Sequence, residues 1–313
     1  MLSEVLTIGF LLTERVPTSC NGRMLETQTR STQTMSLITD LFSVAGRTAV
    51  ITGGGAGIGY SMAEAWVKNG GKVYINARRE EPLKEAVAKL NAISKDSAFF
   101  VAADVATKEG VDKLVKDIAS RESSIDVLVN NAGMGRFDTL EPGAFLPTYD
   151  PDAWAQQFSL NTWSPAAITS AFAPLLVEAA TKGEGRGSVI LISSISDSMW
   201  YAASEMTGVL MTGYKLSKVA ETALTKILAN KLVVHGVRVN VISPGTFPTP
   251  ANDPSNEIMP SRQPEKHVPM KRNGTADDIA GAFLYLATRA SAYVTGERFA
   301  VDGGWLLVAN GRF

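Results

Sequence analysis

The feature that most constrains the fold of this chain is a regular alternation, from about Gly46 onwards, between short apolar runs and longer segments of helical periodicity. Strands are predicted at Thr48–Thr52, Lys72–Asn76, Ala98–Ala102, Ile125–Val129, Ser188–Ile192, Val237–Ile242 and Arg298–Val301. Helices are predicted between them at Tyr60–Asn69, Pro82–Ile93, Lys108–Ser120, Asp152–Ala180 (broken by Pro165 and Pro174), Thr212–His235 and Thr275–Thr288. Strands that are apolar throughout need cover on both faces, so the alternation predicts a single doubly wound α/β domain with a mostly parallel seven-stranded sheet.

Residues 1–45 differ from the rest of the chain and are expected to form a poorly ordered N-terminal extension ahead of a catalytic domain over residues 46–313. The first part of the extension is rich in Thr and Ser and carries glutamates among its arginines. Glu4 precedes the apolar run Val5–Leu12, whereas a signal peptide has a positive start, and transit peptides are poor in acidic residues. These observations favour a cytoplasmic location.

Composition and charge exclude several classes of partner and site. Hydrophobic residues make up 45% and charged residues 19% of the chain, which is a globular composition. The net charge of -1 argues against a nucleic-acid or anionic-membrane partner, and the run Val5–Leu12 is too short to span a bilayer. One cysteine, Cys20, excludes an internal disulfide, and with only two histidines in the chain no metal centre is expected.

A glycine-rich turn follows the first predicted strand and leads directly into a helix. Its sequence is Thr52-Gly53-Gly54-Gly55-Ala56-Gly57-Ile58-Gly59. Glycines let the backbone turn tightly and approach a pyrophosphate, whose charge is favoured at a helix N-terminus. Ligands of open α/β sheets bind beyond the carboxyl ends of the strands. The position of the turn therefore predicts a dinucleotide site in a Rossmann-type domain.

The spacing T-G-x-x-x-G-I-G resembles that of the short-chain dehydrogenase/reductase family, and five further motifs of that family follow in order within about residues 46–305. They are Asp104-Val105, Asn130-Asn131-Ala132-Gly133, Tyr214-Lys215-Leu216-Ser217-Lys218, Pro244-Gly245-Thr246-Phe247-Pro248-Thr249 and Val301-Asp302-Gly303-Gly304. The resemblance implies an NAD(P)-dependent oxidoreductase. It implies cofactor binding by Thr52, Gly53, Gly57, Ile58, Gly59, Asp104, Val105, Asn131, Tyr214, Lys218, Phe247 and Thr249.

The end of the second predicted strand favours NADP(H), with NAD(H) as the other possibility. An NAD-selective site places a carboxylate here for the ribose 2′-hydroxyl, but this chain has Ala77 followed by Arg78 and Arg79. A guanidinium pairs with the 2′-phosphate of NADP(H), and we assign this role to Arg78. The glycine turn lacks a second basic residue, since Ala56 occupies the position where some NADP-preferring relatives have arginine.

Tyr214 and Lys218 are separated by one helical turn, so both side chains emerge on one face of a helix. A neighbouring ammonium stabilises a phenolate and brings proton transfer by tyrosine into the working pH range. By the resemblance, Tyr214 exchanges a proton with the substrate oxygen and Lys218 holds the nicotinamide ribose. Ser194 hydrogen-bonds the same oxygen, and Asn161 holds a water of the proton relay.

Two nearby residues are weaker candidates for these roles. Tyr201 has Glu205 where a lysine is needed, and a carboxylate raises the pKa of a neighbouring phenol. Ser193 precedes Ser194 in the motif that ends the fifth strand, and Ser194 is chosen as its second serine. Tyr214 follows Ser194 later than is usual in the family, so the intervening loop is lengthened.

Two long segments and a proline-rich segment are expected to shape a substrate pocket. Arg136–Gln157 contains four aromatic residues, Asp197–Gly213 is rich in aromatic residues and methionine, and residues 247–270 have the character of a mobile lid. Such residues fit a bulky aromatic or apolar ketone, although they could equally pack against each other or a second subunit. By the resemblance, helices Asp152–Ala180 and Thr212–His235 form the interface of a homodimer or homotetramer.

The leading hypothesis is an NADPH-dependent reductase that converts a carbonyl into a secondary alcohol, with Tyr214 as proton donor. The alternative within the enzyme class is a dehydrogenase of a polyol or sugar-type alcohol. A catalytically silent nucleotide-binding or scaffold protein is the alternative from another class. Such a protein tends to lose catalytic residues, whereas Asn161, Ser194, Tyr214 and Lys218 are all present.

Overall fold

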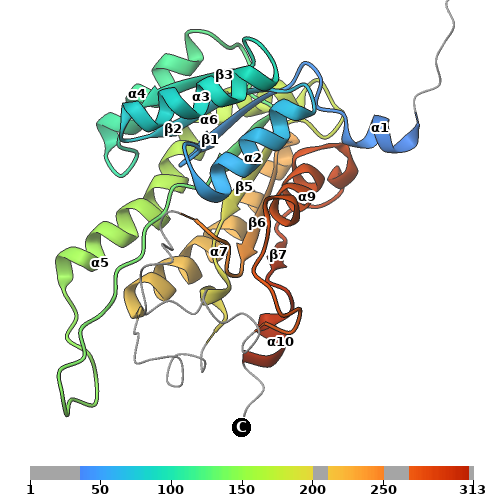
Figure 1. The fold of residues 1–313 in the computed structure, drawn as a ribbon. Helices are drawn as coiled ribbons and strands as arrows, with labels where there is room; N and C mark the ends of the chain where they lie inside the picture. Colours follow the sequence, from blue (N-terminus) through green and yellow to red (C-terminus); the bar gives the residue numbers. More distant parts are fainter. Residues whose placement is uncertain (1–35, 200–210, 250–267, 310–313) are drawn as a thin grey trace, which may run out of the picture. The chain divides into compact units, whose positions relative to one another are not determined.

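The computed structural model describes residues 36–199, 211–249 and 268–309. Its centre is a seven-stranded sheet with the order β3-β2-β1-β4-β5-β6-β7, in which every neighbouring pair is parallel (Figure 1). The strands are β1 (Thr48–Thr52), β2 (Lys72–Ala77), β3 (Ala98–Ala102), β4 (Val127–Asn130), β5 (Ser188–Ile192), β6 (Arg238–Pro244) and β7 (Arg298–Val301). The predicted doubly wound fold is confirmed, and the sheet is parallel throughout.

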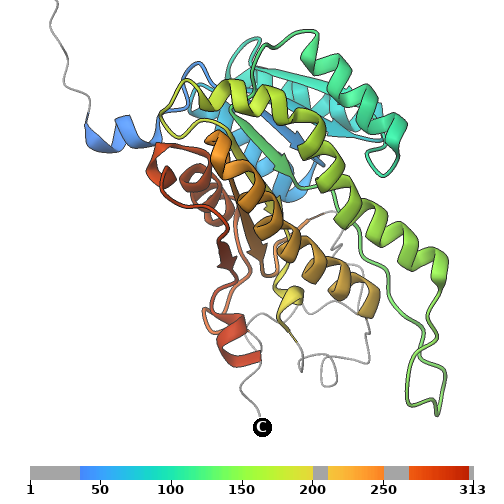
Figure 2. The same cartoon turned by 180° about the vertical axis from the view of Figure 1, so that it is seen from behind.

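Helices cover both faces of this sheet. One face carries α2 (Gly57–Lys68), α3 (Glu80–Ile93) and α9 (Ala276–Ala287), and the other carries α4 (Lys108–Ala119), α6 (Ser164–Ala180) and α7 (Thr212–Leu232), as the two opposite views show (Figures 1 and 2). The remaining α-helices of the described residues are α1 (Leu37–Phe42), α5 (Pro151–Phe158) and α10 (Trp305–Ala309). Within the described ranges, no helix is long and apolar enough to cross a membrane.

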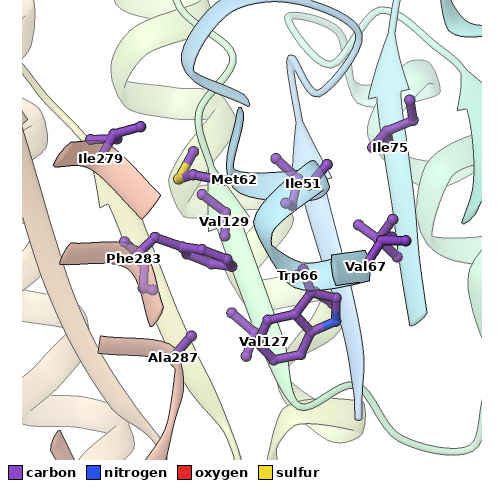
Figure 3. Close-up of a cluster of buried hydrophobic side chains, with 14 of the residues drawn as sticks. Ile51, Met62, Trp66, Val67, Ile75, Val127, Val129, Ile279, Phe283 and Ala287 are labelled. Carbon is purple, nitrogen blue, oxygen red and sulfur yellow. The ribbon is translucent and has the colours of Figure 1, made fainter. Parts of the chain in front are cut away.

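Alternate residues of β1 to β6 enter two separate cores, which is why these strands are rich in apolar residues, whereas the edge strand β7 packs on one core only. In β1, Ile51 packs under α2 and α9, whereas Val50 packs on the opposite face with α4 and α6. The first core centres on Trp66 and Phe283, whose ring centres are 5.7 Å apart (Figure 3). Burial of each such side chain contributes about 1.5–3 kcal/mol.

The segment between β4 and β5 differs from its prediction. Helix α5 continues through a π-helical turn, η1 (Ser159–Trp163), into α6. Pro165 directly follows the π-helical turn, so its missing N–H falls at the irregular junction between η1 and α6. The expected break at Pro174 is wrong, because this residue lies inside α6. The carbonyl that it leaves without a helical partner belongs to Ser170, an exposed residue.

Part of the predicted extension is helical. Ser36 caps α1 by accepting a hydrogen bond from the Thr39 amide, and Asp40 forms a 2.7 Å ion pair with Arg289, which follows α9. Residues 36–45 of the predicted extension are therefore part of the described structure, ahead of Gly46, where the alternating pattern was predicted to start.

Candidate active site

A cavity of about 660 Å³ lies at the carboxyl ends of the parallel strands. It is bordered by residues that follow β1 to β6, including Gly53, Arg78, Asp104, Asn131 and Ser194. This is the place where an open α/β sheet binds its ligand. All predicted site residues line the cavity except Thr52 and Asn161, which are buried beside it.

The glycine turn is held open by side chains of neighbouring segments. Thr52 Oγ1 accepts hydrogen bonds from the Asn131 and Ala132 amides, each at 3.0 Å. In return, Asn131 Nδ2 donates to the carbonyls of Thr52 and Gly53, at 2.8 and 3.2 Å. Thr52 and Asn131 therefore hold the turn from the side of the sheet, and the turn borders the cavity on its other side.

At two positions of this turn, Gly53 and Gly59, a residue with a side chain would be strained or would clash. Gly53 has a φ of +65°, which favours glycine, and a Cβ at Gly59 would lie 2.4 Å from the Gly53 carbonyl oxygen. Helix α2 begins at Gly57, and its N-cap residue Ala56 provides no side-chain hydrogen bond to the first turn. The bare amides at this helix N-terminus and the close backbone cradle fit a pyrophosphate. The residues present therefore fit a dinucleotide cofactor.

Charged side chains follow the next two strands. Arg78 is exposed at the end of β2, and no carboxylate of the described residues lies within ion-pair distance of it. After β3, Asp104 accepts a hydrogen bond from the Ala106 amide at 3.1 Å. Ala77 contributes no charge, and of the two exposed arginines that follow β2 it is Arg78, not Arg79, that lines the cavity.

Tyr214 and Lys218 lie in the first two turns of α7, and both line the cavity. Lys218 Nζ is 5.9 Å from the centre of the Tyr214 ring. It donates hydrogen bonds to the Ile192 carbonyl at 2.8 Å and to Glu221 Oε2 at 2.7 Å. An ammonium has three hydrogens, so one remains for a ligand in the cavity.

Glu221 is the acidic partner of Lys218 that sequence reasoning missed. It is 1% exposed and lies three residues after Lys218 on the same face of α7, a spacing that could have revealed it. Burial raises the pKa of Glu221 to about 7, against the opposing influence of Lys218. Burial is the largest influence on Lys218 and acts to lower its pKa, but the charges of Glu221, Tyr214 and Asp197 and the hydrogen bond to Glu221 together outweigh it, so the pKa lies above its ordinary value.

Ser194 and Ser193 have different surroundings. Ser194 lines the cavity with Tyr214, and its Oγ accepts a hydrogen bond from the Ser196 amide at 3.1 Å. Ser193 is 5% exposed, donates to the Lys218 carbonyl at 3.1 Å and accepts from Thr222 at 3.0 Å. Ser193 therefore joins β5 to α7, while the Ser194 hydroxyl retains its hydrogen for a ligand.

Asn161 is fully buried in η1 and joins three segments. Its Oδ1 accepts from the Met134 amide at 2.9 Å, and its Nδ2 donates to the Met134 carbonyl at 2.8 Å and to Ser217 Oγ at 2.9 Å. Ser217 in turn donates to the Tyr214 carbonyl at 2.7 Å. Asn161 thus connects the segment after β4 to the first turn of α7, which carries Tyr214.

A second buried carboxylate, Asp197, fixes the segment that follows β5. It forms two hydrogen bonds with Arg298 of β7, at 2.9 and 2.6 Å, and accepts from Thr222 of α7 at 2.7 Å. Sequence reasoning missed this residue, because nothing in its own segment indicates the partner on β7. The network ties the Ser194 segment to two distant elements.

The aromatic segments contribute less to the cavity than expected. Phe137, Met199 and Met211 line it, but Phe145 is fully exposed, and Trp154 packs against Tyr149 and Phe158. Those last aromatic residues therefore pack on each other. Residues 200–210, including Tyr201, and residues 250–267 of the predicted lid lie outside the described residues, while Phe247 and Val268 are buried. The described residues hold no cluster of His, Cys, Asp or Glu suited to a metal ion.

Comparisons with known proteins show the family to which this fold belongs. A family model described as enoyl-(acyl carrier protein) reductase matches residues 53–306. A short-chain dehydrogenase/reductase of Diaporthe leptostromiformis, PhomF, is 33% identical over 89% of this chain and 98% of its own. The solved RhlG/NADP complex of Pseudomonas aeruginosa has a TM-score of 0.74 and 31% identity over 85% of this chain and 99% of its own.

A third similarity is to the NADPH-dependent 3-quinuclidinone reductase of Rhodotorula rubra, with a TM-score of 0.74 and 28% identity, over 88% of this chain and 97% of that one. The family predicted from the ordered motifs is confirmed. This chain belongs to the short-chain dehydrogenase/reductase family of oxidoreductases, which act on alcohol and carbonyl groups.

Proposed function

We propose that this protein is an NADPH-dependent reductase that converts the carbonyl of a bulky aromatic or apolar ketone into a secondary alcohol. The observation that carries the proposal is that Tyr214, Ser194 and Lys218 line the same cavity as the glycine turn and Arg78. Met134, Phe137, Met199, Met211 and Trp305 give that cavity an apolar lining. This lining supports a bulky apolar substrate over a polyol.

The proposed chemistry divides the carbonyl reduction between cofactor and protein. NADPH, when bound, supplies a hydride to the carbonyl carbon. The Tyr214 hydroxyl donates a proton to the carbonyl oxygen, and the Ser194 hydroxyl hydrogen-bonds the same oxygen while charge develops on it. The remaining Lys218 hydrogen is directed to the nicotinamide ribose, and the Lys218 charge favours the phenolate that Tyr214 becomes. Water is proposed to return the proton to Tyr214 through a site held by Asn161.

The preference for NADPH is proposed from Arg78. Its unpaired guanidinium supports pairing with the 2′-phosphate, and two of the similar structures are named with NADP or NADPH. Arg78→Ala should lower kcat/KM for NADPH about 10- to 100-fold, by loss of charge-assisted hydrogen bonds, and leave that for NADH unchanged. Arg79→Ala, at the exposed neighbour, is the matched control. A wild-type enzyme with higher kcat/KM for NADH would contradict the preference.

The reaction is tested by NADPH consumption at 340 nm with bulky aromatic ketones, small ketones and sugars. Turnover of the aromatic set supports the proposal. If NADPH binds and only the sugars are reduced, the substrate class is wrong and the reading as a dehydrogenase of a polyol or sugar-type alcohol, which runs in reverse with NADP⁺, replaces it.

We also infer that the protein forms a homodimer or homotetramer and acts in the cytoplasm. Trp163, Leu216 and Ile227 are 40–54% exposed along η1 and α7, which supports an interface on these helices. Light scattering of the purified protein tests the assembly, and a monomer would contradict it. Cell fractionation tests the location.

A further inference from the structure

Lys215 follows Tyr214 in α7 and lines the same cavity. Its side chain is half-buried, and its Nζ donates a hydrogen bond of 3.3 Å to the carbonyl of Met199. Among the described residues, no carboxylate lies within ion-pair distance of Lys215. Within the described residues, a single long hydrogen bond to a neutral carbonyl is the compensation that Lys215 has for its positive charge.

The other charged residues of the cavity belong to its nucleotide end or are already paired. Arg78 and Asp104 follow β2 and β3, and Lys218 is paired with Glu221 at 2.7 Å. Around Tyr214, the described lining consists of neutral side chains, chiefly Phe137, Ser194, Met199, Met211 and Trp305. Among the described residues that line the cavity around Tyr214, Lys215 therefore carries the one unpaired charge, and its surroundings are mainly apolar.

A half-buried ammonium in apolar surroundings is unfavourable unless an anion accompanies it. Burial accordingly lowers the pKa of Lys215. A substrate anion would restore the missing charge partner and gain from the low local dielectric.

We propose that Lys215 is an anion-binding residue of the substrate site, and that the carbonyl substrate also carries an acidic group such as a carboxylate. This inference rests on the proposed ketone reduction, because it names the substrate class of the same site. In this arrangement Tyr214 and Ser194 address the carbonyl, and Lys215 selects among ketones by their charge.

A binding experiment tests Lys215 independently of turnover. The affinities of 2-naphthoate and of its neutral analogue 2-naphthamide are measured by calorimetry on the protein loaded with NADP⁺. We expect the wild type to bind the carboxylate about tenfold or more tightly than the amide. Lys215→Gln and Lys215→Met should abolish this difference without changing NADPH affinity, and Lys215→Arg should retain it. Lys226→Gln, at an exposed lysine of the same helix, is the matched control and should keep the difference.

The proposal is overturned if the wild type binds both probes equally, or if Lys226→Gln removes the preference as Lys215→Gln does. A parallel assay with 4-acetylbenzoate and its methyl ester separates this proposal from the proposed function. Lys215→Gln should raise KM for the acid alone and leave kcat for both compounds. A carboxylate preference that depends on Lys215, with no ketone reduced, would support the anion site and contradict the reductase. Reduction of both ketones with equal probe affinities would do the reverse.

Discussion

The ammonium of Lys218 lies 2.7 Å from the carboxylate of Glu221, and the two residues are 3% and 1% exposed. This is a buried ion pair within α7, directly behind the candidate catalytic tyrosine. Together with the Ile192 carbonyl, Glu221 fixes Lys218 Nζ in position before any ligand binds. Glu221 is therefore a positioning residue for Lys218.

Glu221→Leu should be strongly destabilising, because it leaves the Lys218 ammonium buried with no counter-charge. Breaking a buried ion pair in this way costs about 3–5 kcal/mol. Glu221→Gln should cost less, since its amide oxygen still accepts a hydrogen bond. The free energy of unfolding from denaturant titrations measures both. Wild-type stability in Glu221→Leu would show that the pair is not formed in solution.

The pH dependence of stability should carry the signature of Glu221. Its pKa rises from 4.5 to about 7 on burial, so the native state binds more protons than the unfolded chain between these values. The stability that protonation of Glu221 provides is complete below about 4.5 and is lost as the pH rises through about 7. We expect the stability of the wild type relative to Glu221→Gln to fall as the pH rises across that interval. A difference independent of pH would contradict this origin.

Gly59→Ala should disrupt the glycine turn. The new Cβ would lie 2.4 Å from the Gly53 carbonyl oxygen and 2.5 Å from Asn131 Nδ2, both parts of the fixed cradle. Overpacking of this kind costs about 1–3 kcal/mol, and we expect NADPH affinity to fall with it. Gly55→Ala is the matched control, since its Cβ would meet only Leu83 at an ordinary 3.4 Å. Equal NADPH dissociation constants for both variants would exclude the cradle as the cofactor site.

Ser194→Ala and Ser193→Ala should separate catalysis from stability. Loss of the Ser194 hydroxyl removes a hydrogen bond to the developing oxyanion, which lowers kcat about 10²-fold. Loss of the Ser193 hydroxyl removes the hydrogen bonds that join β5 to Thr222 and to the Lys218 carbonyl, and it costs about 0.5–1.5 kcal/mol of stability for each bond, with a smaller effect on kcat. If Ser194→Ala keeps full activity and Ser193→Ala loses activity, Ser193 and not Ser194 is the serine that hydrogen-bonds the substrate oxygen.

The sheet could be predicted from the sequence because each strand carries its own signal. Residues such as Val50 and Ile51 are apolar in succession, since both faces of β1 are buried, whereas the edge strand β7 was marked only by a short run with no buried residue. Helix starts were harder to place. Helix α2 begins at Gly57, whereas the prediction placed its start at Tyr60. The glycines before Tyr60 have low helix propensity, so the sequence alone did not mark them as helical.

The candidate site was predictable as far as local motifs extend. Tyr214 and Lys218 form a recognisable pair, and the cavity brings them together with Ser194. Glu221 and Asp197 escaped prediction because their importance arises from burial and from contacts such as that with Arg298, a hundred residues away in the chain. A carboxylate on a helix is normally exposed to solvent, and only packing shows otherwise.

Single-turnover reduction of an aromatic ketone by Tyr214→Phe, beside Tyr201→Phe as control, tests the central claim most directly. The phenylalanine keeps the ring but removes the proton donor, so we expect the rate to fall about 10²- to 10⁴-fold with NADPH affinity unchanged. Tyr201→Phe should retain the wild-type rate. A wild-type rate in Tyr214→Phe would contradict the role of Tyr214 as proton donor. Loss of the reaction in Tyr201→Phe instead would contradict it as well.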